Sequence, residues 1–311
     1  MASSAKTCKK KIWTKKFVWD IIFYTSIIAW PVVQFCIMWI GVNINSFTLS
    51  MKSYNVDKMG YEFVWFDNFK DVFHDLLNEG LLFTALGNSL WLYALSLFVC
   101  MPAGILISYY IFKKLPLSGA FKVILYLPSF ISGLVLTLIF SFLADRGYPE
   151  IMLKLTGTQP FGLLAGEHKY ATVICYWFFF HLASGILLYV GGMSTISESL
   201  FEAARLDGAN MMHEFRYIII PGIFPTIQTY LITGAAGVLT ADPNLFLFFD
   251  TKADPKYWTF GYYMFVGVKE ASPTTGYPYY AAFGLILSFM AIPIVFGMRW
   301  LTAKLDPMRE A

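Results

Sequence analysis

Six long stretches of the chain are apolar and contain no Asp, Glu, Lys or Arg, and shorter polar segments separate them. A run of about 20 apolar residues, rising 1.5 Å per residue, is long enough to cross the hydrocarbon layer of a membrane as a helix. The pattern therefore predicts an all-α polytopic membrane protein with six transmembrane helices. We place these helices at Phe17–Val42, Thr84–Phe112, Val123–Leu143, Ala171–Ser194, Tyr217–Leu239 and Tyr280–Leu301.

The composition supports a membrane protein and excludes several other classes. Of the 311 residues, 57% are hydrophobic and only 14% are charged, and the mean hydropathy is +0.58. Soluble domains average about 25% charged residues, so this chain has too few charges to cover a surface that faces water. A net charge of +3 is too small for a nucleic-acid-binding protein.

The positions of Lys and Arg predict the orientation in the membrane. If the connections alternate between two sides, one side has 14 basic residues in 59 positions and the other has 9 in 108. Because basic residues concentrate on the cytoplasmic side, we expect both termini in the cytoplasm. The chain then divides into a basic cytoplasmic tail, residues 1–16, and a transmembrane domain, residues 17–311.

The outer segments are long enough to fold. We expect residues 43–83 to form a cap with a short helix at Asp71–Asn78, and residues 145–169 to contain an interfacial helix near Pro149–Leu155. Residues 242–278 contain several Asp-Pro and Ser-Pro breakers. Composition alone leaves open whether these segments receive another protein or are solvated loops.

One cytoplasmic segment, residues 197–216, has a helical pattern on each side of Gly208. A glycine permits the positive φ that ends a helix, so we expect two short helices joined at this residue. Their apolar and charged surface can dock into a groove on a cytoplasmic partner. Capping residues are available for both helices: Ser197 or Ser199 with Glu202 for the first, and Asn210 for the second.

The same segment has a sequence signature in which Glu-Ala-Ala, three residues, Gly, nine residues and Ile-x-Ile-Pro follow one another. This spacing resembles the coupling-loop signature of type I permease subunits of ATP-binding-cassette (ABC) importers, with Ile220 where Leu is usual. The Asp-Gly-Ala at its centre is similar to the carbohydrate-uptake branch. We define residues 197–221 as the coupling loop, and the residues that match are Glu202, Ala203, Ala204, Asp207, Gly208 and Pro221.

The resemblance implies a function and a set of partners. In this family the permease has no catalytic site and needs no cofactor, because a separate cytoplasmic ATPase hydrolyses ATP. The chain would form half of a translocation pathway in the bacterial inner membrane. Its expected partners are two ATPase subunits, a second permease subunit, an extracytoplasmic solute-binding protein, membrane lipid and a sugar cargo.

Two groups of polar residues within the spans are candidates for contacting the cargo, because polar groups in a membrane are costly and often functional. Trp177, His181 and Ser184 are spaced to share one face of the fourth helix. An aromatic ring can stack on a sugar, and imidazole or hydroxyl groups can bond its hydroxyls. Thr233 and Gly234 belong to a small, polar strip of the fifth helix. Packing against lipid or against a neighbouring helix remains open for both groups.

Other functions find less support in the sequence. A secondary transporter driven by ions or protons usually has charged residues inside its spans, and here only Asp20 lies in one, near its end. No cluster of Cys and His has metal-ligand spacing. An importer for a non-carbohydrate solute remains the main alternative.

Overall fold

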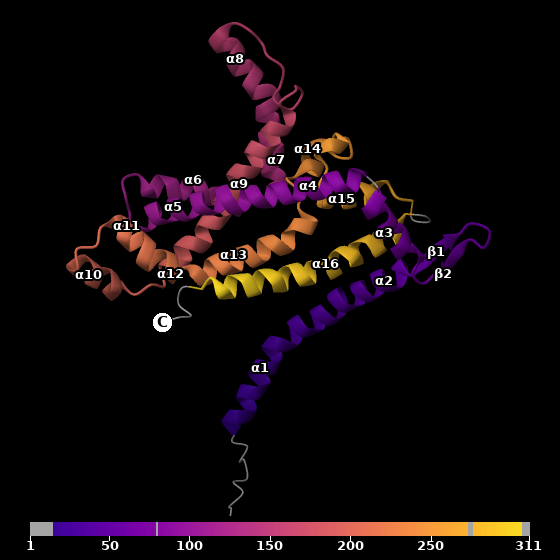
Figure 1. Ribbon diagram of the computed structural model, residues 1–311, viewed down its shortest axis with the longest axis horizontal. Helices are drawn as coiled ribbons and strands as arrows, with labels where there is room; N and C mark the ends of the chain where they lie inside the picture. The colour runs from indigo at the N-terminus through magenta and orange to yellow at the C-terminus, as the bar shows by residue number, and fades with distance from the viewer. Residues whose placement is uncertain (1–14, 79, 273–275, 307–311) are drawn as a thin grey trace, which may run out of the picture.

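The computed structural model describes residues 15–78, 80–272 and 276–306. Most of the long helices lie side by side in a bundle, and the first one extends away from it (Figure 1). In these ranges five helical segments are long and apolar enough to cross a membrane, and most of the basic tail 1–16 lies outside the described residues. The first segment consists of α1 (Lys15–Gln34), η1 (Phe35–Ile40) and α2 (Gly41–Ser50). The second consists of α4 (Gly80–Leu95), η2 (Ser96–Cys100) and α5 (Met101–Phe112). Two further segments are single helices, α9 (Lys169–Met193) and α16 (Tyr277–Lys304). The segment between them in the chain consists of α13 (Phe224–Gly237), η5 (Val238–Thr240) and α14 (Leu245–Phe249).

The third predicted span departs from one straight helix. Instead of a single helix over Val123–Leu143, α6 (Ser118–Phe130) and α7 (Gly133–Phe142) meet at a bend of 109°. Ile131 and Ser132 have extended backbone at the break. The apolar pattern contains no signal for this turn, because the segments on both sides of the break are apolar. Figure 1 shows α7 leaving the bundle, continued by η3 (Leu143–Gly147) and α8 (Tyr148–Thr156), the helix expected near Pro149–Leu155.

A small cap follows the first spanning helix, which continues to Ser50 and so takes in residues from 43 onward that were expected in the outer loop. The cap adds the antiparallel hairpin β1 (Lys52–Asn55) and β2 (Gly60–Phe63) to the otherwise helical fold. The next helix, α3 (Asp67–Asn78), begins four residues before the predicted start. The Asn68 amide joins helix and hairpin, since it donates to the carbonyl oxygens of Ser50 and Lys52 at 2.7 and 2.8 Å.

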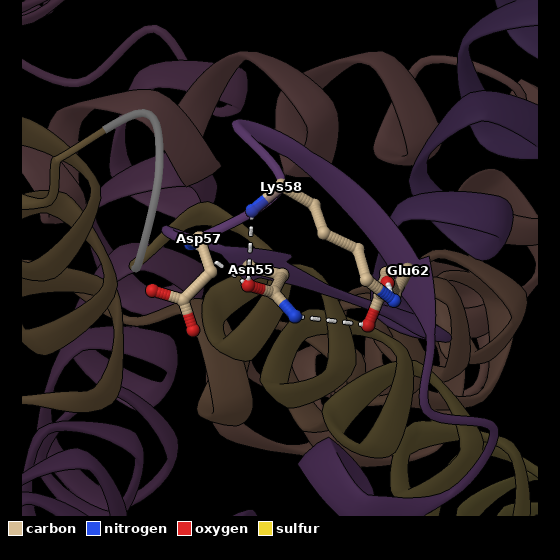
Figure 2. Close-up of polar contacts among 4 residues, drawn as sticks. All are labelled: Asn55, Asp57, Lys58 and Glu62. Carbon is tan, nitrogen blue, oxygen red and sulfur yellow. Dashed lines mark hydrogen bonds and ion pairs between the residues drawn. The ribbon is translucent and has the colours of Figure 1, made fainter.

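Side-chain hydrogen bonds close the hairpin, as Figure 2 shows. The Oδ1 atom of Asn55 accepts from the backbone N–H groups of Asp57 and Lys58 at 2.9 and 3.3 Å, and its Nδ2 donates to Glu62 at 3.1 Å. The ammonium of Lys58 contacts the same carboxylate at 2.5 Å. One asparagine therefore shapes the turn and links it to β2.

Two apolar clusters lie toward opposite ends of the bundle. One packs α3 and α4 against α15 (Phe260–Glu270) and α16, with Val72, Leu82, Phe260 and Phe283 buried. The other packs α5 and α9 against the coupling loop. Figure 1 shows the coupling loop and the hairpin at opposite ends of the molecule. The remaining described elements are α10 (Glu198–Leu206), α11 (Met211–Glu214), η4 (Phe215–Ile219), α12 (Ile220–Gly222) and η6 (Pro255–Tyr257).

Candidate functional site

The coupling loop folds into the two predicted short helices, α10 and α11, with Gly208 between them. Gly208 has φ +78°, which is the left-handed conformation that glycine adopts without steric cost. Its N–H bonds to the carbonyl of Arg205 at 3.1 Å, and the N–H of Ala209 bonds to that of Ala204 at 2.9 Å. This pair of bonds is a Schellman motif, which ends α10 and fixes the turn.

The predicted caps differ between the two helices. Asn210 caps α11, because its Oδ1 accepts from the backbone N–H groups of Met212 and His213 at 3.0 and 2.9 Å. Ser197 stands at the N-cap position of α10 but makes no side-chain cap bond. Its hydroxyl instead lies 2.7 Å from that of Ser199. The expected capping box with Glu202 is absent, which leaves the Glu202 carboxylate available to a partner.

The inner side of the coupling loop is fixed to the end of the second spanning helix. Phe201 is buried and its ring lies 5.8 Å from that of Phe112. The hydroxyl of Tyr109 donates to the carbonyl of Met211 at 3.2 Å. Lys113 forms a largely buried ion pair with Glu214. These contacts make the loop and the second helix one mechanical unit.

The outer side of the loop is exposed. Glu202 and Ala203 are exposed and Ala204 is partly buried. Leu206 and Met212 show 90% and 70% of their surface to solvent. A cavity of 500 Å³ lies between α10 and the ends of the second and fourth spanning helices, lined by Phe112, Lys113, Lys114, Ser194, Ile196, Glu198, Phe201, Glu202 and Arg205. The loop therefore presents an apolar knob beside a charged groove.

Pro221 lies within the connection to the fifth spanning helix rather than at its start. The π-helical η4 and the single turn α12 follow α11, and α13 begins only at Phe224. A side chain at Gly222 would place its Cβ 2.6 Å from Ile196, so this connection packs closely against the segment between α9 and the coupling loop. Of the six matching residues, Pro221 alone lies outside the α10–turn–α11 unit.

A second candidate site is a cavity of 450 Å³ between the second, fourth and fifth spanning helices, which we call the inner cavity. It brings together four of the five residues that were considered for cargo contact: Trp177, His181, Thr233 and Gly234. Ser184 lines a different, smaller cavity, and its hydroxyl donates to the carbonyl of His181 at 2.8 Å. The inner cavity is lined by Ser89, Leu92, Tyr93, Ser96, Trp177, His181, Leu188, Tyr230, Thr233, Gly234, Gly237, Val238, Ala241 and Asp242.

The side chains of two residues, Ser96 and Tyr230, meet at His181. Its Nε2 lies 2.7 Å from the hydroxyl of Ser96 and 2.8 Å from that of Tyr230, and the two hydroxyls are 3.0 Å apart. Each residue comes from a different spanning helix, so this network joins the three helices at the cavity wall. Ser96 and Tyr230 were not predicted from the sequence, because their pairing with His181 depends on how the helices are arranged. In the structure Ser96 belongs to the π-helical turn η2, and such turns are frequent at functional sites in helices.

The aromatic part of the predicted face is also present. The rings of Trp177 and His181 stack with centroids 4.5 Å apart and planes 16° apart. A Cβ at Gly234 would lie 3.0 Å from the Tyr93 ring, so glycine keeps the cavity open at this point. The wall thus combines a flat aromatic surface with hydroxyl and imidazole groups. Within the described ranges, no group of Cys, His, Asp and Glu residues could hold a metal ion.

Comparison with known proteins identifies the family. A family model described as the binding-protein-dependent transport system inner membrane component matches residues 100–309. Protein LplB of Bacillus subtilis (strain 168) is 26% identical over 268 residues, which are 79% of this chain and 77% of LplB. The arabinooligosaccharides transport system permease protein AraP of the same organism is 29% identical over 165 residues, 50% of this chain and 51% of AraP.

The fold is similar to that of a solved transporter chain. A chain in the crystal structure of a bacterial alginate ABC transporter, in complex with an alginate pentasaccharide-bound periplasmic protein, matches with a TM-score of 0.70. The match covers 96% of this chain and 99% of that chain at 20% identity. The multiple sugar-binding transport system permease protein MsmF of Streptococcus mutans is 26% identical over 60% of this chain and 63% of its own length. Because the family model covers well over half of the sequence, the chain belongs to the family of inner membrane components of binding-protein-dependent transport systems.

Proposed function

We propose that this chain is one of two permease subunits of an ABC importer and carries a sugar or oligosaccharide across the inner membrane. The observation that carries this proposal is the inner cavity, where the stacked Trp177 and His181 rings lie beside the Ser96 and Tyr230 hydroxyls. Flat aromatic surfaces and hydrogen-bonding groups are what a sugar, with its apolar faces and peripheral hydroxyls, requires. The names of AraP and MsmF, which both refer to saccharides, support this cargo.

The coupling loop would transmit motion from a cytoplasmic ATPase. Glu202 provides an exposed charge, Ala203 and Ala204 allow close approach, and the turn at Gly208 keeps α10 and α11 at a fixed angle. Asp207 precedes this turn, and Pro221 follows it on the path to the fifth helix. A movement of the loop would be transmitted to two spanning helices. The second helix receives it through Lys113 and Glu214, and the fifth through η4 and α12.

The residues of the inner cavity would act on the cargo in different ways. Trp177 offers a ring face, and His181 is held by two hydroxyls so that one edge of its ring is fixed. Thr233 and Gly234 form the opposite wall on the fifth helix. Ser184 contributes indirectly, because its hydroxyl bonds the backbone of the turn that carries His181.

The assembly needs further chains. Two ATPase subunits would hydrolyse ATP and bind the coupling loops, so this chain requires no catalytic residue or cofactor of its own. A second permease would complete the pathway, and a solute-binding protein would deliver the cargo on the outer side. The density of Lys and Arg supports a location of both termini in the cytoplasm, and the family supports the inner membrane as the location.

Reconstituted transport tests the cargo part of the proposal. The assembled transporter in liposomes, with its binding protein and internal ATP, should take up a neutral saccharide and not an amino acid or phosphate. Trp177→Leu and His181→Ala should lower this uptake strongly, whereas Trp30→Leu, on the exposed first helix, should leave it unchanged. Equal uptake by Trp177→Leu and the parent, or uptake restricted to a non-carbohydrate solute, would contradict the sugar proposal.

Co-purification tests the coupling part. The tagged chain in mild detergent should retain an ATPase and a second permease, and Glu202→Arg should release the ATPase. Glu150→Arg, on α8 far from the loop, is the matched charge reversal and should retain it. A parent chain that brings down no nucleotide-binding partner from intact membranes would point to a stand-alone transporter. A fluorescent reporter that is active only in the cytoplasm, fused after residue 311, tests the predicted orientation.

A further inference from the structure

A second cavity, with a volume of 570 Å³, lies next to the inner cavity, and we call it the outer cavity. It lies where α9 begins, whereas the coupling loop follows the end of the same helix. Leu92 lines both cavities. Asn88 and Pro243 line the outer cavity, and their sequence neighbours Ser89 and Asp242 line the inner cavity. The two cavities are therefore adjacent compartments that share one wall.

The outer cavity contains exposed aromatic rings beside polar groups. Trp91 shows 62% of its surface and Tyr257 shows 36%. Glu167 and His168, in the segment before α9, are exposed and line the same space. Several spanning helices of this chain carry exposed tryptophans, and Trp91 differs from Trp30 and Trp300 because it lines a cavity.

A rigid platform supports the aromatic wall. The rings of Tyr170 and Tyr257 stack with centroids 3.6 Å apart, and the Tyr170 hydroxyl accepts a bond from the backbone N–H of Asp254. The Asn88 amide donates to the carbonyl oxygens of Lys256 and Trp258, both at 2.9 Å. These contacts hold the segment of Tyr257 against the second and fourth spanning helices, so the outer cavity is preformed.

The volumes set the size of a possible ligand. Sites for small molecules have volumes of about 300–1,000 Å³. Each cavity alone is within this range, at 570 and 450 Å³, so the two together can hold a ligand much longer than one that fills either. The chemistry is the same in both: an aromatic face, Trp91 or Trp177, next to hydrogen-bonding side chains.

We propose that the outer cavity is a second saccharide subsite, which holds the sugar units that follow those in the inner cavity, so that the preferred cargo is an oligosaccharide that fills both. This inference rests on the proposed function. Trp91 and Tyr257 supply the stacking surfaces, and Glu167 and His168 bond sugar hydroxyls at the entrance. Short saccharides occupy only the inner cavity and gain nothing from the outer one.

Uptake of a chain-length series tests this proposal. The reconstituted transporter is given neutral gluco-, galacto- and arabino-oligosaccharides of one to six units, each series with one linkage, and KM is measured for each length. The variant Trp91→Leu removes a ring that is mostly exposed, so the fold should be retained; Trp300→Leu, also 62% exposed and outside both cavities, is the control. A second variant, Glu167→Gln, replaces the charged carboxylate by a neutral amide of the same shape.

We expect Trp91→Leu to raise KM about fivefold or more for saccharides of four to six units, which is the scale of one lost aromatic contact. For one or two units KM should change by less than about twofold. Trp177→Leu, in the inner cavity, should raise KM at every length. An equal effect of Trp91→Leu on all lengths, or none on any, overturns the second subsite but leaves the proposed function standing. Failure of the parent to take up any saccharide overturns both.

Discussion

The ammonium of Lys113, just after the second spanning helix, is paired with the carboxylate of Glu214 in the coupling loop, and only 14% and 7% of their side-chain surfaces are exposed. The Lys113 ammonium also lies 5.2 Å from the centre of the Phe201 ring, which α10 inserts under it. Both helices of the loop thus converge on one cation. This arrangement explains why the loop can behave as a part of the second helix.

Removing one member of this pair should destabilise the loop. Breaking a buried ion pair by deleting one partner costs about 3–5 kcal/mol, because the other charge stays buried and unpaired. We therefore expect Glu214→Ala to lower the thermal unfolding temperature in detergent and to weaken retention of the ATPase. Glu62→Ala, which breaks the exposed pair with Lys58 on the outer side, is the control and should do neither. A Glu214→Ala protein as stable as the parent would mean that water reaches the pair.

Gly208→Ala should damage coupling through the backbone. A left-handed conformation costs an alanine about 1–2 kcal/mol, and nothing lies within 4 Å of the new Cβ, so strain in the turn is the whole effect. Gly157→Ala is a closely matched control, since its φ is +74° and its Cβ is equally unobstructed, but it ends α8. Both variants should lose similar stability, and only Gly208→Ala should lose ATP-driven uptake. Equal loss of uptake would show a general effect of destabilisation.

Gly267→Ala should disturb the packing of α15 on α16. The added Cβ would lie 2.1 Å from a ring carbon of Tyr280, a distance that requires the Tyr280 side chain or one of the helices to shift. Overpacking of this kind costs about 1–3 kcal/mol. Gly297→Ala, in the interior of α16 with nothing within 4 Å, should not destabilise the protein, because alanine forms helix more readily than glycine. Unfolding of both variants by heat, followed by tryptophan fluorescence, measures the difference; equal midpoints would contradict this packing.

Tyr230→Phe should lower uptake without unfolding the protein. The ring remains, but the hydroxyl that contacts His181 and Ser96 is lost, and one hydrogen bond contributes about 0.5–1.5 kcal/mol. We expect a severalfold rise in KM for the cargo with ATPase assembly intact. Tyr110→Phe, which removes a hydroxyl bonded to the carbonyl of Pro116 outside the cavity, is the comparison. If both variants transport equally well, the three-residue network does not contact the cargo.

The hairpin should open in acid. The hydrogen bond from Lys58 holds the pKa of Glu62 below its ordinary value of 4.5, and the same contact raises the pKa of Lys58 above 10.5. Stabilisation from Glu62 is therefore fully present above its unfolded pKa and is lost as the pH falls through the lower folded value. Stabilisation from Lys58 is present below 10.5 and is lost as the pH rises through the higher folded value.

Hydrogen exchange of residues 52–63, corrected for the intrinsic effect of pH, measures this opening. Protection should be constant near neutral pH and should decrease in strong acid. Glu62→Gln keeps the acceptor oxygen but cannot titrate, so its acid response should disappear. An unchanged acid response in this variant would assign the opening to another group.

The long helices were predictable because one physical requirement, about 20 apolar residues in a row, determines them. The segment Lys169–Met193 differs from its prediction by only a few residues. The bend after Phe130 was not predictable on this basis, because hydropathy reports whether a residue can lie in lipid and says nothing about helix direction. The hairpin was not predicted either, because strands of four residues are too short to show a clear alternation of apolar and polar positions.

The candidate site was predictable to the extent that it follows local rules. The turn at Gly208 and the cap at Asn210 depend on neighbours in the sequence, and both are present. The partners of His181 come from residues 85 and 49 positions away in the chain. Lys113 and Glu214 are 101 positions apart. Pairings of this kind depend on how helices are arranged, which the spacing along one helix does not contain.

The two bonds from Asn88 reach carbonyl oxygens 168 and 170 residues later in the chain. During synthesis the second helix enters the membrane while these acceptors do not yet exist. Its amide must then be satisfied by water or by the insertion machinery until residue 258 has been translated, because an unpaired polar group is costly in lipid. The outer wall of the pathway can therefore close only after most of the chain has been made, and biogenesis has a late, defined step at this asparagine.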